Sequence, residues 1–184
     1  MTLLSSCTEE GKAGYTPPPE YQTLHRPNFK GALFQFEFDD DQFLALSQHQ
    51  GGAKKGVTVF RDGDSEPVIF EERIHSQRDL QIWTFSQKGT KPEHILSYLR
   101  APGVIIGERI FILNRGKKLA ASVMAEPSSE QFRYTFKTDE SFAAAGMSGS
   151  PIFQPRTGAV IGVLQTANHR TKATIGGFEL LKMK

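Results

Sequence analysis

The sequence predicts an all-β fold. The chain has 184 residues, with 17 glycines and 10 prolines, and its apolar residues come in many short runs separated by turn-forming residues. Short apolar runs bounded by Gly, Pro, Asp and Asn are typical of strands, and there is little of the long periodicity that marks helices. A chain of this length can bury a substantial core in one domain, or in two small barrels that share a cleft.

The first half of the chain contains the strands of a predicted first barrel. Residues 31–38 (GALFQFEF) alternate between apolar and polar, and the three aspartates 39–41 form a polar turn before the next strand, which ends at His49. This pattern predicts a hairpin. The predicted strands are 31–38, 43–49, 57–60, 67–70 and 80–85. Together they are expected to form a barrel over about residues 28–90.

The second half repeats the pattern of strands. Residues 91–100 (KPEHILSYLR) are interpreted as a short helix with Pro92 in its first turn, or as an irregular crossover between barrels. The apolar runs that follow are 107–113, 119–124, 132–136, a run at Ile152, 160–164 and 175–180. Six strands fit a second barrel over about residues 101–184.

Charge and cysteine content exclude several classes of function. Lysine and arginine number 22 against 20 aspartates and glutamates, a formal net charge of +2, so nothing favours a nucleic-acid partner. The single cysteine excludes an intrachain disulfide framework and a cysteine-rich zinc site. No stretch has the roughly 20 apolar residues of a transmembrane helix.

Residues 1–24 are expected to be a leader or flexible tether before a folded domain at 25–184. The run 3–7 (LLSSC) is similar to the end of a bacterial lipoprotein signal, in which the cysteine is acylated, but residues 1–4 supply neither a charged start nor an apolar core. Two interpretations stay open. Cys7 is a lipid anchor of a cell-envelope protein, the one expected membrane contact, with the proline-containing segment 8–21 as tether; or this is an ordinary N-terminus of a cytoplasmic protein.

The run 144–153 (AAGMSGSPIF) contains the most specific chemistry. A serine hydroxyl is a weak nucleophile, so it needs a sharp turn, a nearby base and backbone N–H groups directed at the developing oxyanion. Glycines on both sides of Ser148 permit such a turn. The hexapeptide 146–151 (GMSGSP) resembles the nucleophile loop of trypsin-like serine proteases of the chymotrypsin fold, in a compact bacterial form. The alternative is an ordinary Gly/Ser turn between two strands.

The resemblance implies a histidine and an aspartate upstream, in the order His, Asp, Ser. Residues 43–49 (FLALSQH) resemble the family's apolar strand that ends in the base, which assigns His49, although the family has two small residues before its histidine and Gln48 replaces one of them here. Residues 78–83 (RDLQIW) resemble the segment in which the acid opens a strand, which assigns Asp79. The other histidines, His25, His75, His94 and His169, lack this order and strand context.

The resemblance also implies the architecture and the mechanism. Two six-stranded antiparallel barrels pack with an active-site cleft between them, and the substrate is a protein or peptide. His49 takes the proton of Ser148, Asp79 orients the imidazole, and the N–H groups of Gly146 and Ser148 form the oxyanion hole. This serine endopeptidase mechanism, which passes through an acyl-enzyme, needs no metal and no cofactor.

Substrate-binding residues follow from the same resemblance. The pocket for the side chain before the cleaved bond is expected to be lined by Phe142 and Ala143 and by Gln165, Thr166 and Ala167. Neither segment contains an acid, and Leu164 stands where glutamate-specific relatives place a polar group. Because a basic substrate side chain needs a buried counter-charge, a small or apolar side chain is expected.

Two other classes of protein remain open on the sequence. The first is a catalytically inactive binding module that keeps the protease fold, to which the departure at Gln48 points. The second is an unrelated β-rich surface lipoprotein in which the three matches are coincidental. Convergence of His49, Asp79 and Ser148 in space separates both from an enzyme.

Overall fold

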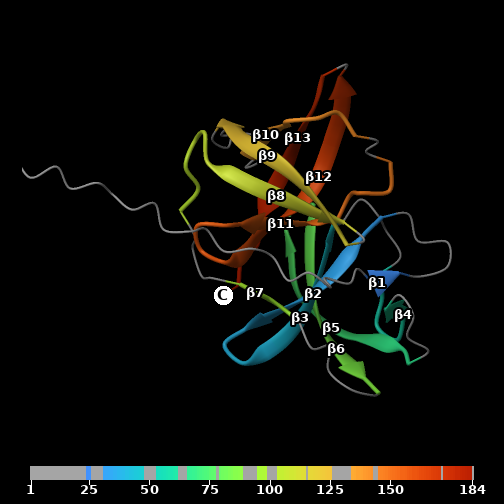
Figure 1. The fold of residues 1–184 in the computed structure, drawn as a ribbon. Helices are drawn as coiled ribbons and strands as arrows, with labels where there is room; N and C mark the ends of the chain where they lie inside the picture. Colours follow the sequence, from blue (N-terminus) through green and yellow to red (C-terminus); the bar gives the residue numbers. More distant parts are fainter. Residues whose placement is uncertain are drawn as a thin grey trace, which may run out of the picture.

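The computed structural model describes residues 24–25, 31–47, 53–61, 66–77, 79–88, 95–98, 103–114, 116–125, 134–142, 145–170 and 172–183. All regular secondary structure in this part of the chain is β-strand, which confirms the predicted all-β class. The described residues contain no helix long and apolar enough to cross a membrane. The strands form two sheets, one from each half of the chain (Figure 1).

The first sheet curls around its own interior. Its strands lie in the order β1-β4-β5-β6-β3-β2-β7. Their bounds are β1 Leu24–His25, β2 Leu33–Phe38, β3 Asp41–Ser47, β4 Thr58–Arg61, β5 Val68–Gln77, β6 Leu80–Gln87 and β7 Leu96–Ser97. The short strand β1 pairs antiparallel with β4 and, through Leu24 and Leu33, with β2 as well. Through these two pairings β1 links β4 to β2, which lie near opposite ends of the strand order.

The second sheet is a closed barrel with the strand order β10-β13-β12-β11-β8-β9. The bounds are β8 Arg109–Asn114, β9 Lys117–Ala125, β10 Tyr134–Thr138, β11 Pro151–Gln154, β12 Ala159–Arg170 and β13 Ala173–Leu180. Each overlaps a strand predicted from the sequence. Closure leaves this sheet without a free edge.

Side-chain alternation along the strands distributes the core among three clusters. In β3, Leu44 and Leu46 pack inside the first sheet, whereas Ala45 between them packs against the second barrel. In β12, Val160 packs against the first sheet and the next residue, Ile161, packs inside its own barrel. Successive side chains of a strand point to opposite faces. Strands at the junction are therefore apolar on both faces.

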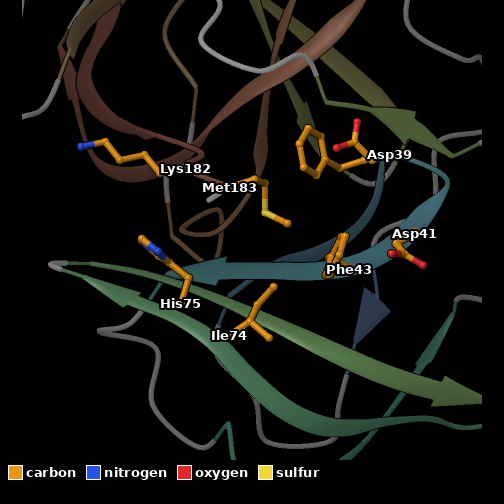
Figure 2. A pocket seen from close by; sticks show the side chains of 8 residues that line it. Asp39, Asp41, Phe43, Ile74, His75, Lys182 and Met183 are labelled. Carbon is orange, nitrogen blue, oxygen red and sulfur yellow. The ribbon is translucent and has the colours of Figure 1, made fainter.

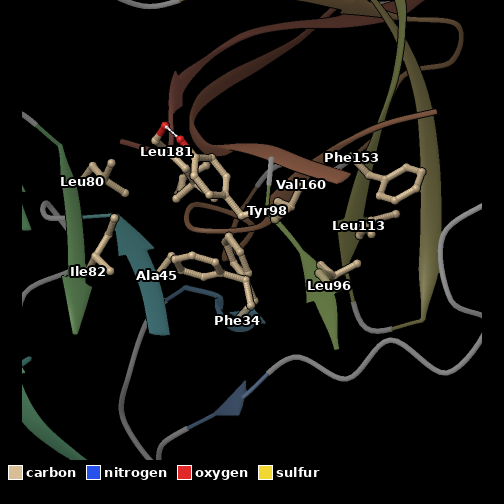
Figure 3. Close-up of a cluster of buried hydrophobic side chains, with 12 residues drawn as sticks. Phe34, Ala45, Leu80, Ile82, Leu96, Tyr98, Leu113, Phe153, Val160 and Leu181 are labelled. Carbon is tan, nitrogen blue, oxygen red and sulfur yellow. Dashed lines mark hydrogen bonds between the residues drawn. The ribbon is translucent and has the colours of Figure 1, made fainter. Parts of the chain in front are cut away.

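The cluster between the sheets, here called the inter-sheet cluster, joins the two halves of the chain (Figure 3). Its buried members are Phe34, Phe36, Ala45, Leu80, Ile82, Leu96, Tyr98, Leu113, Phe153, Val160, Val163 and Leu181. The Tyr98 hydroxyl, the polar group of this apolar region, donates a hydrogen bond to the Leu181 carbonyl at 2.9 Å. A buried tyrosine needs such a partner.

Residues 95–98 are extended, so the helical interpretation of 91–100 is wrong for them. Strand β7 runs parallel to β2 in a sheet of seven strands, whereas the sequence pattern predicted five strands here and the family resemblance implied six. Leu96 and Tyr98 are buried and Ser97 between them is exposed, which is the two-residue period of a strand. The segment is too short for that period to be recognised in the sequence. Residues 91–94 and 99–100 lie outside the described residues.

Candidate active site

Ser148 lies in a tight turn between β10 and β11. The N–H of Ser150 donates to the carbonyl oxygen of Met147 at 3.0 Å, which closes a four-residue turn with Ser148 and Gly149 at its centre. Gly149 has a φ of +91°. A type II turn requires positive φ at its third position, and glycine adopts it without strain. The order Ser-Gly therefore places the serine at the corner of the turn.

The turn is fixed to the second barrel on both sides of the serine. Gly149 donates its N–H to the Leu164 carbonyl at 2.7 Å, and the Leu164 N–H donates to the Ser150 carbonyl at 2.8 Å. The Ser150 side chain is fully buried, and its hydroxyl accepts a hydrogen bond from the Asn114 amide at 2.8 Å. Met147 packs in the core of the barrel. Ser148 itself is only half-buried.

Ser148 also connects to the first sheet. The backbone N–H of Ala32, immediately before β2, donates to the Ser148 carbonyl oxygen at 2.7 Å. The Ser148 hydroxyl donates to the Gln165 carbonyl oxygen of β12 at 3.3 Å, which is a long contact for an O–H donor. The serine therefore stands at the junction of the two sheets.

Asp79 lies at the start of β6, beside the strand end that leads to His49. Gln77 and Leu80 are paired across the hairpin of β5 and β6, so the connection that contains Asp79 is short. Leu80 also pairs with Ser47, the last residue of β3. His49 follows Ser47 by two positions in the chain. Asp79 is buried, with 9% of the residue's surface exposed.

His49 and Gln48 lie outside the described residues, so their positions relative to Ser148 stay predictions. His75, one of the competing histidines, lies in β5 and lines a different pocket (Figure 2). The side chains of the other three histidines are also outside the described part of the chain.

Phe142 is held at the approach to the turn by a buried threonine. The Phe142 N–H donates to the Thr174 hydroxyl oxygen at 3.0 Å, and this hydroxyl in turn lies 3.3 Å from the Phe142 carbonyl oxygen. The Thr174 N–H donates to the Thr138 hydroxyl at 2.7 Å. The Phe142 ring packs on the same core cluster as Met147, next to Ser148 in the chain. Ala143 lies outside the described residues.

The three predicted residues of β12 differ in their surroundings. Thr166 is exposed, whereas Ala167 packs against the cluster that contains Phe142. Gln165 is 1% exposed, and neither polar atom of its side-chain amide has a hydrogen-bond partner among the described residues. The pairing of β12 with β13 changes register between Leu164 and Thr166. Leu164 and Ala167, on either side of this irregularity, both contact the core cluster, and the buried Gln165 amide lies between them in the strand.

Gly176 of β13 has no room for a side chain. A Cβ atom at this position would lie 2.3 Å from the carbonyl oxygen of Thr166 and 2.5 Å from the Phe136 ring. Strand β13 therefore approaches β12 closely behind Thr166 and Ala167, and glycine is required there.

Two contributors to this region were not predicted from the sequence. Ala32 acts through its backbone N–H, which every residue except proline possesses, so its identity carries no signal. Thr174 is a polar residue between the apolar Ala173 and Ile175 of β13, and that contrast was its one signal.

Arg109 and Asp139 form an exposed ion pair near the start of the 139–142 segment. The Arg109 Nη1 atom donates to Asp139 Oδ1 at 2.8 Å, and a second contact joins Nη2 to Oδ2. The hydrogen bonds from Arg109 hold the pKa of the Asp139 carboxyl below its ordinary value of 3.8, and those bonds raise the pKa of Arg109.

No protein-family model and no curated protein matches the sequence. Solved structures do match over most of the chain. The human pathogenic astrovirus serine protease gives a TM-score of 0.63 at 17% identity, covering 92% of this chain and 94% of its own. Thermobifida fusca Protease A gives 0.57 at 13% identity, covering 88% and 90%. Kallikrein-related peptidase 10 gives 0.66 at 10% identity, covering 88% and 90%. Identities this low show the fold alone, and the chain has the chymotrypsin fold that these serine proteases share.

Proposed function

We propose that the chain is a serine endopeptidase in which Ser148 attacks the carbonyl carbon of a peptide bond. The observation that carries the proposal is the geometry of the serine turn. Ser148 is half-buried at a corner formed by Gly149, whereas Met147 and Ser150 on either side are buried. A hydroxyl presented on a rigid turn loses little conformational entropy when substrate binds.

His49 and Asp79 complete the proposed triad. His49 takes the hydroxyl proton of Ser148 during attack and returns it to the leaving amine. Asp79 accepts a hydrogen bond from the other ring nitrogen and stabilises the imidazolium. The pairing of Ser47 with Leu80 supports this assignment, because it brings the chain segments before His49 and after Asp79 side by side.

The oxyanion is bound by the N–H groups of Gly146 and Ser148. Gly146 has a φ of +78°, and no atom lies within 4 Å of the position that a Cβ would take. This open face supports a close approach of a substrate carbonyl.

The preferred substrate has a small or apolar side chain before the cleaved bond. Phe142 and Ala167 belong to an apolar cluster, and the adjoining Gln165 and Thr166 are neutral. No carboxylate in these segments could pair with a basic substrate side chain.

One contact favours the second candidate, an inactive binding module with this fold. The Ser148 hydroxyl donates to the Gln165 carbonyl, and attack on a substrate requires that proton to be transferred to a base instead.

Labelling with a fluorophosphonate probe decides between the two candidates. The active enzyme is expected to react at Ser148, with the modified peptide identified by mass spectrometry, and Ser148→Ala is expected to abolish labelling. Ser97→Ala is the matched control, because Ser97 is an exposed serine of β7. Folded wild-type protein that does not react supports the binding module and contradicts the enzyme.

A further inference from the structure

A pocket of about 300 Å³ opens on the first sheet, apart from the serine turn (Figure 2). It is lined by residues of the β2–β3 hairpin, of β5 and of the segment after β13. These residues are Phe38, Asp39, Asp41, Phe43, Ile74, His75, Lys182 and Met183. Ligand sites in proteins begin at about this volume.

The floor of the pocket is apolar and packs on the core. Phe38, Phe43 and Met183 are half-buried and pack against the inter-sheet cluster. The Phe38 ring makes an edge contact with the buried Tyr98 ring, with the centroids 5.3 Å apart. Ile74 is 42% exposed, although it is a large aliphatic residue. When an apolar group of a ligand covers an exposed apolar surface, the free energy falls because water is released from both surfaces.

The two ends of the pocket differ in charge. Figure 2 shows Lys182 and His75 on one side and Asp39 and Asp41 on the other, with Ile74, Phe43 and Met183 between them. A lysine ammonium selects a carboxylate, and the two aspartates select a cation. The complementary ligand therefore carries both signs of charge, separated by an apolar part.

The strand register gives the length of that ligand. His75 pairs with Ile82, and Ile82 pairs with Ala45, so His75 lies two strands away from β3. Two strand spacings are about 10 Å, and the four residues from Ala45 to Asp41 add about 13 Å along β3. The Cα atoms of His75 and Asp41 are therefore roughly 16 Å apart. Side chains extend inward from both ends. An extended peptide of about three or four residues spans the remainder, whereas a free amino acid is too short.

We propose that this pocket binds an extended peptide segment with a basic side chain at one end, an acidic side chain at the other and aliphatic side chains between them. The site does not include the serine turn, because none of the residues that line the pocket belongs to that turn. Its acidic end lies far from the proposed acid, because β3 runs from Asp41 in the pocket to Ser47 near Asp79, roughly 20 Å away. Binding at this site does not depend on the proposed peptidase activity.

The test is calorimetric titration of the Ser148→Ala variant, in which cleavage cannot consume the peptide. The probe is acetyl-Arg-Leu-Leu-Glu-amide, and its matched control is acetyl-Leu-Arg-Glu-Leu-amide, which has the same composition with adjacent charges. The probe is expected to bind at least tenfold more tightly than the control. Equal binding of the two peptides, or no saturable binding of the probe, overturns the proposal.

Charge reversal tests the polarity of the pocket. Lys182→Glu is expected to weaken binding of the probe at least tenfold and to strengthen binding of acetyl-Arg-Leu-Leu-Arg-amide, because both ends of the pocket are then acidic. Lys117→Glu, which reverses an exposed charge of β9, is expected to change neither affinity. If Lys182→Glu folds with the wild-type circular dichroism spectrum and leaves both affinities unchanged, the proposal is wrong. Ser148 labelling by the fluorophosphonate is a separate readout, so the two proposals fail independently.

Discussion

The backbone N–H of Ala32 donates a 2.7 Å hydrogen bond to the carbonyl oxygen of Ser148. Ala32 precedes β2 of the first sheet, and Ser148 belongs to a turn of the second barrel. The candidate nucleophile is therefore fixed by one bond to the half of the chain that carries its proposed base and acid. In this arrangement the Ala32 bond sets where the Ser148 backbone lies relative to the first sheet.

Replacing Ala32 by proline removes this donor. We expect Ala32→Pro to slow fluorophosphonate labelling of Ser148 at least about tenfold, because a small displacement of a catalytic group can cost up to a hundredfold in rate. Ala32→Gly keeps the N–H and is expected to label at close to the wild-type rate. Labelling rates of the folded proteins are compared by intact mass. Equal rates for the proline and glycine variants contradict a positioning role of this bond.

Asp79→Asn tests the proposed acid. An amide in place of the carboxylate stabilises the wrong tautomer of the histidine, so peptide hydrolysis is expected to fall on the order of 10⁴-fold at neutral pH. Asp139→Asn changes an exposed aspartate of the second half and serves as the control. The measurement is kcat/KM on a peptide with an apolar side chain before the cleaved bond. If kcat/KM falls tenfold or less in Asp79→Asn, Asp79 is not the acid of the triad.

Gly146→Ala separates backbone strain from an effect on the oxyanion hole. Gly146 and Gly116 have φ values of +78° and +72°, and neither has an atom within 4 Å of an added Cβ. Both alanine variants are expected to lose about 1–2 kcal/mol of unfolding free energy, the cost of a left-handed conformation for an L-residue. Gly146→Ala alone is expected to reduce labelling of Ser148. Urea unfolding and labelling rates check the two parts, and equal labelling of both variants contradicts the assignment of Gly146.

Thr174→Val removes the hydroxyl that orients Phe142. Two hydrogen bonds are lost in a buried site with the side-chain volume kept, and the Phe142 N–H is left without its partner. We expect a loss of about 1–3 kcal/mol in unfolding free energy, together with a higher KM because Phe142 is proposed to contact substrate. Thr58→Val, at an exposed position of β4, is the control and is expected to be close to neutral. Unchanged KM in a destabilised Thr174→Val limits Thr174 to a structural role.

The Arg109–Asp139 pair predicts a small stabilisation that disappears in acid. Because Arg109 lowers the pKa of Asp139 in the folded state, the contribution is fully present above the ordinary value of 3.8 and is lost as the pH falls through the lower, folded pKa. Wild type is expected to exceed Asp139→Asn slightly in unfolding free energy at pH 7. The difference should vanish below the folded pKa and shrink in high salt, since both side chains are exposed. A difference that persists in acid contradicts this origin.

The sequence by itself determined most of the strands and the conformation of the serine turn. Strands such as β8 and β12 are long enough to show their apolar pattern, and Gly149 specifies its turn because positive φ is a local requirement of the backbone. Local signals of this kind need no knowledge of distant residues.

Only the tertiary structure decided the features that depend on residues far away in the chain, namely the short strands and the contacts between the two sheets. Strands β1 and β7 are two residues long, so they have no periodicity and exist only through pairing with β2 and β4. The bond from Ala32 to Ser148 and the opposite charges of the pocket at Lys182 and Asp41 likewise join segments more than a hundred residues apart. Such contacts form because the two sheets pack face to face. The sequence contains the residues that take part, but it does not show which of them will meet.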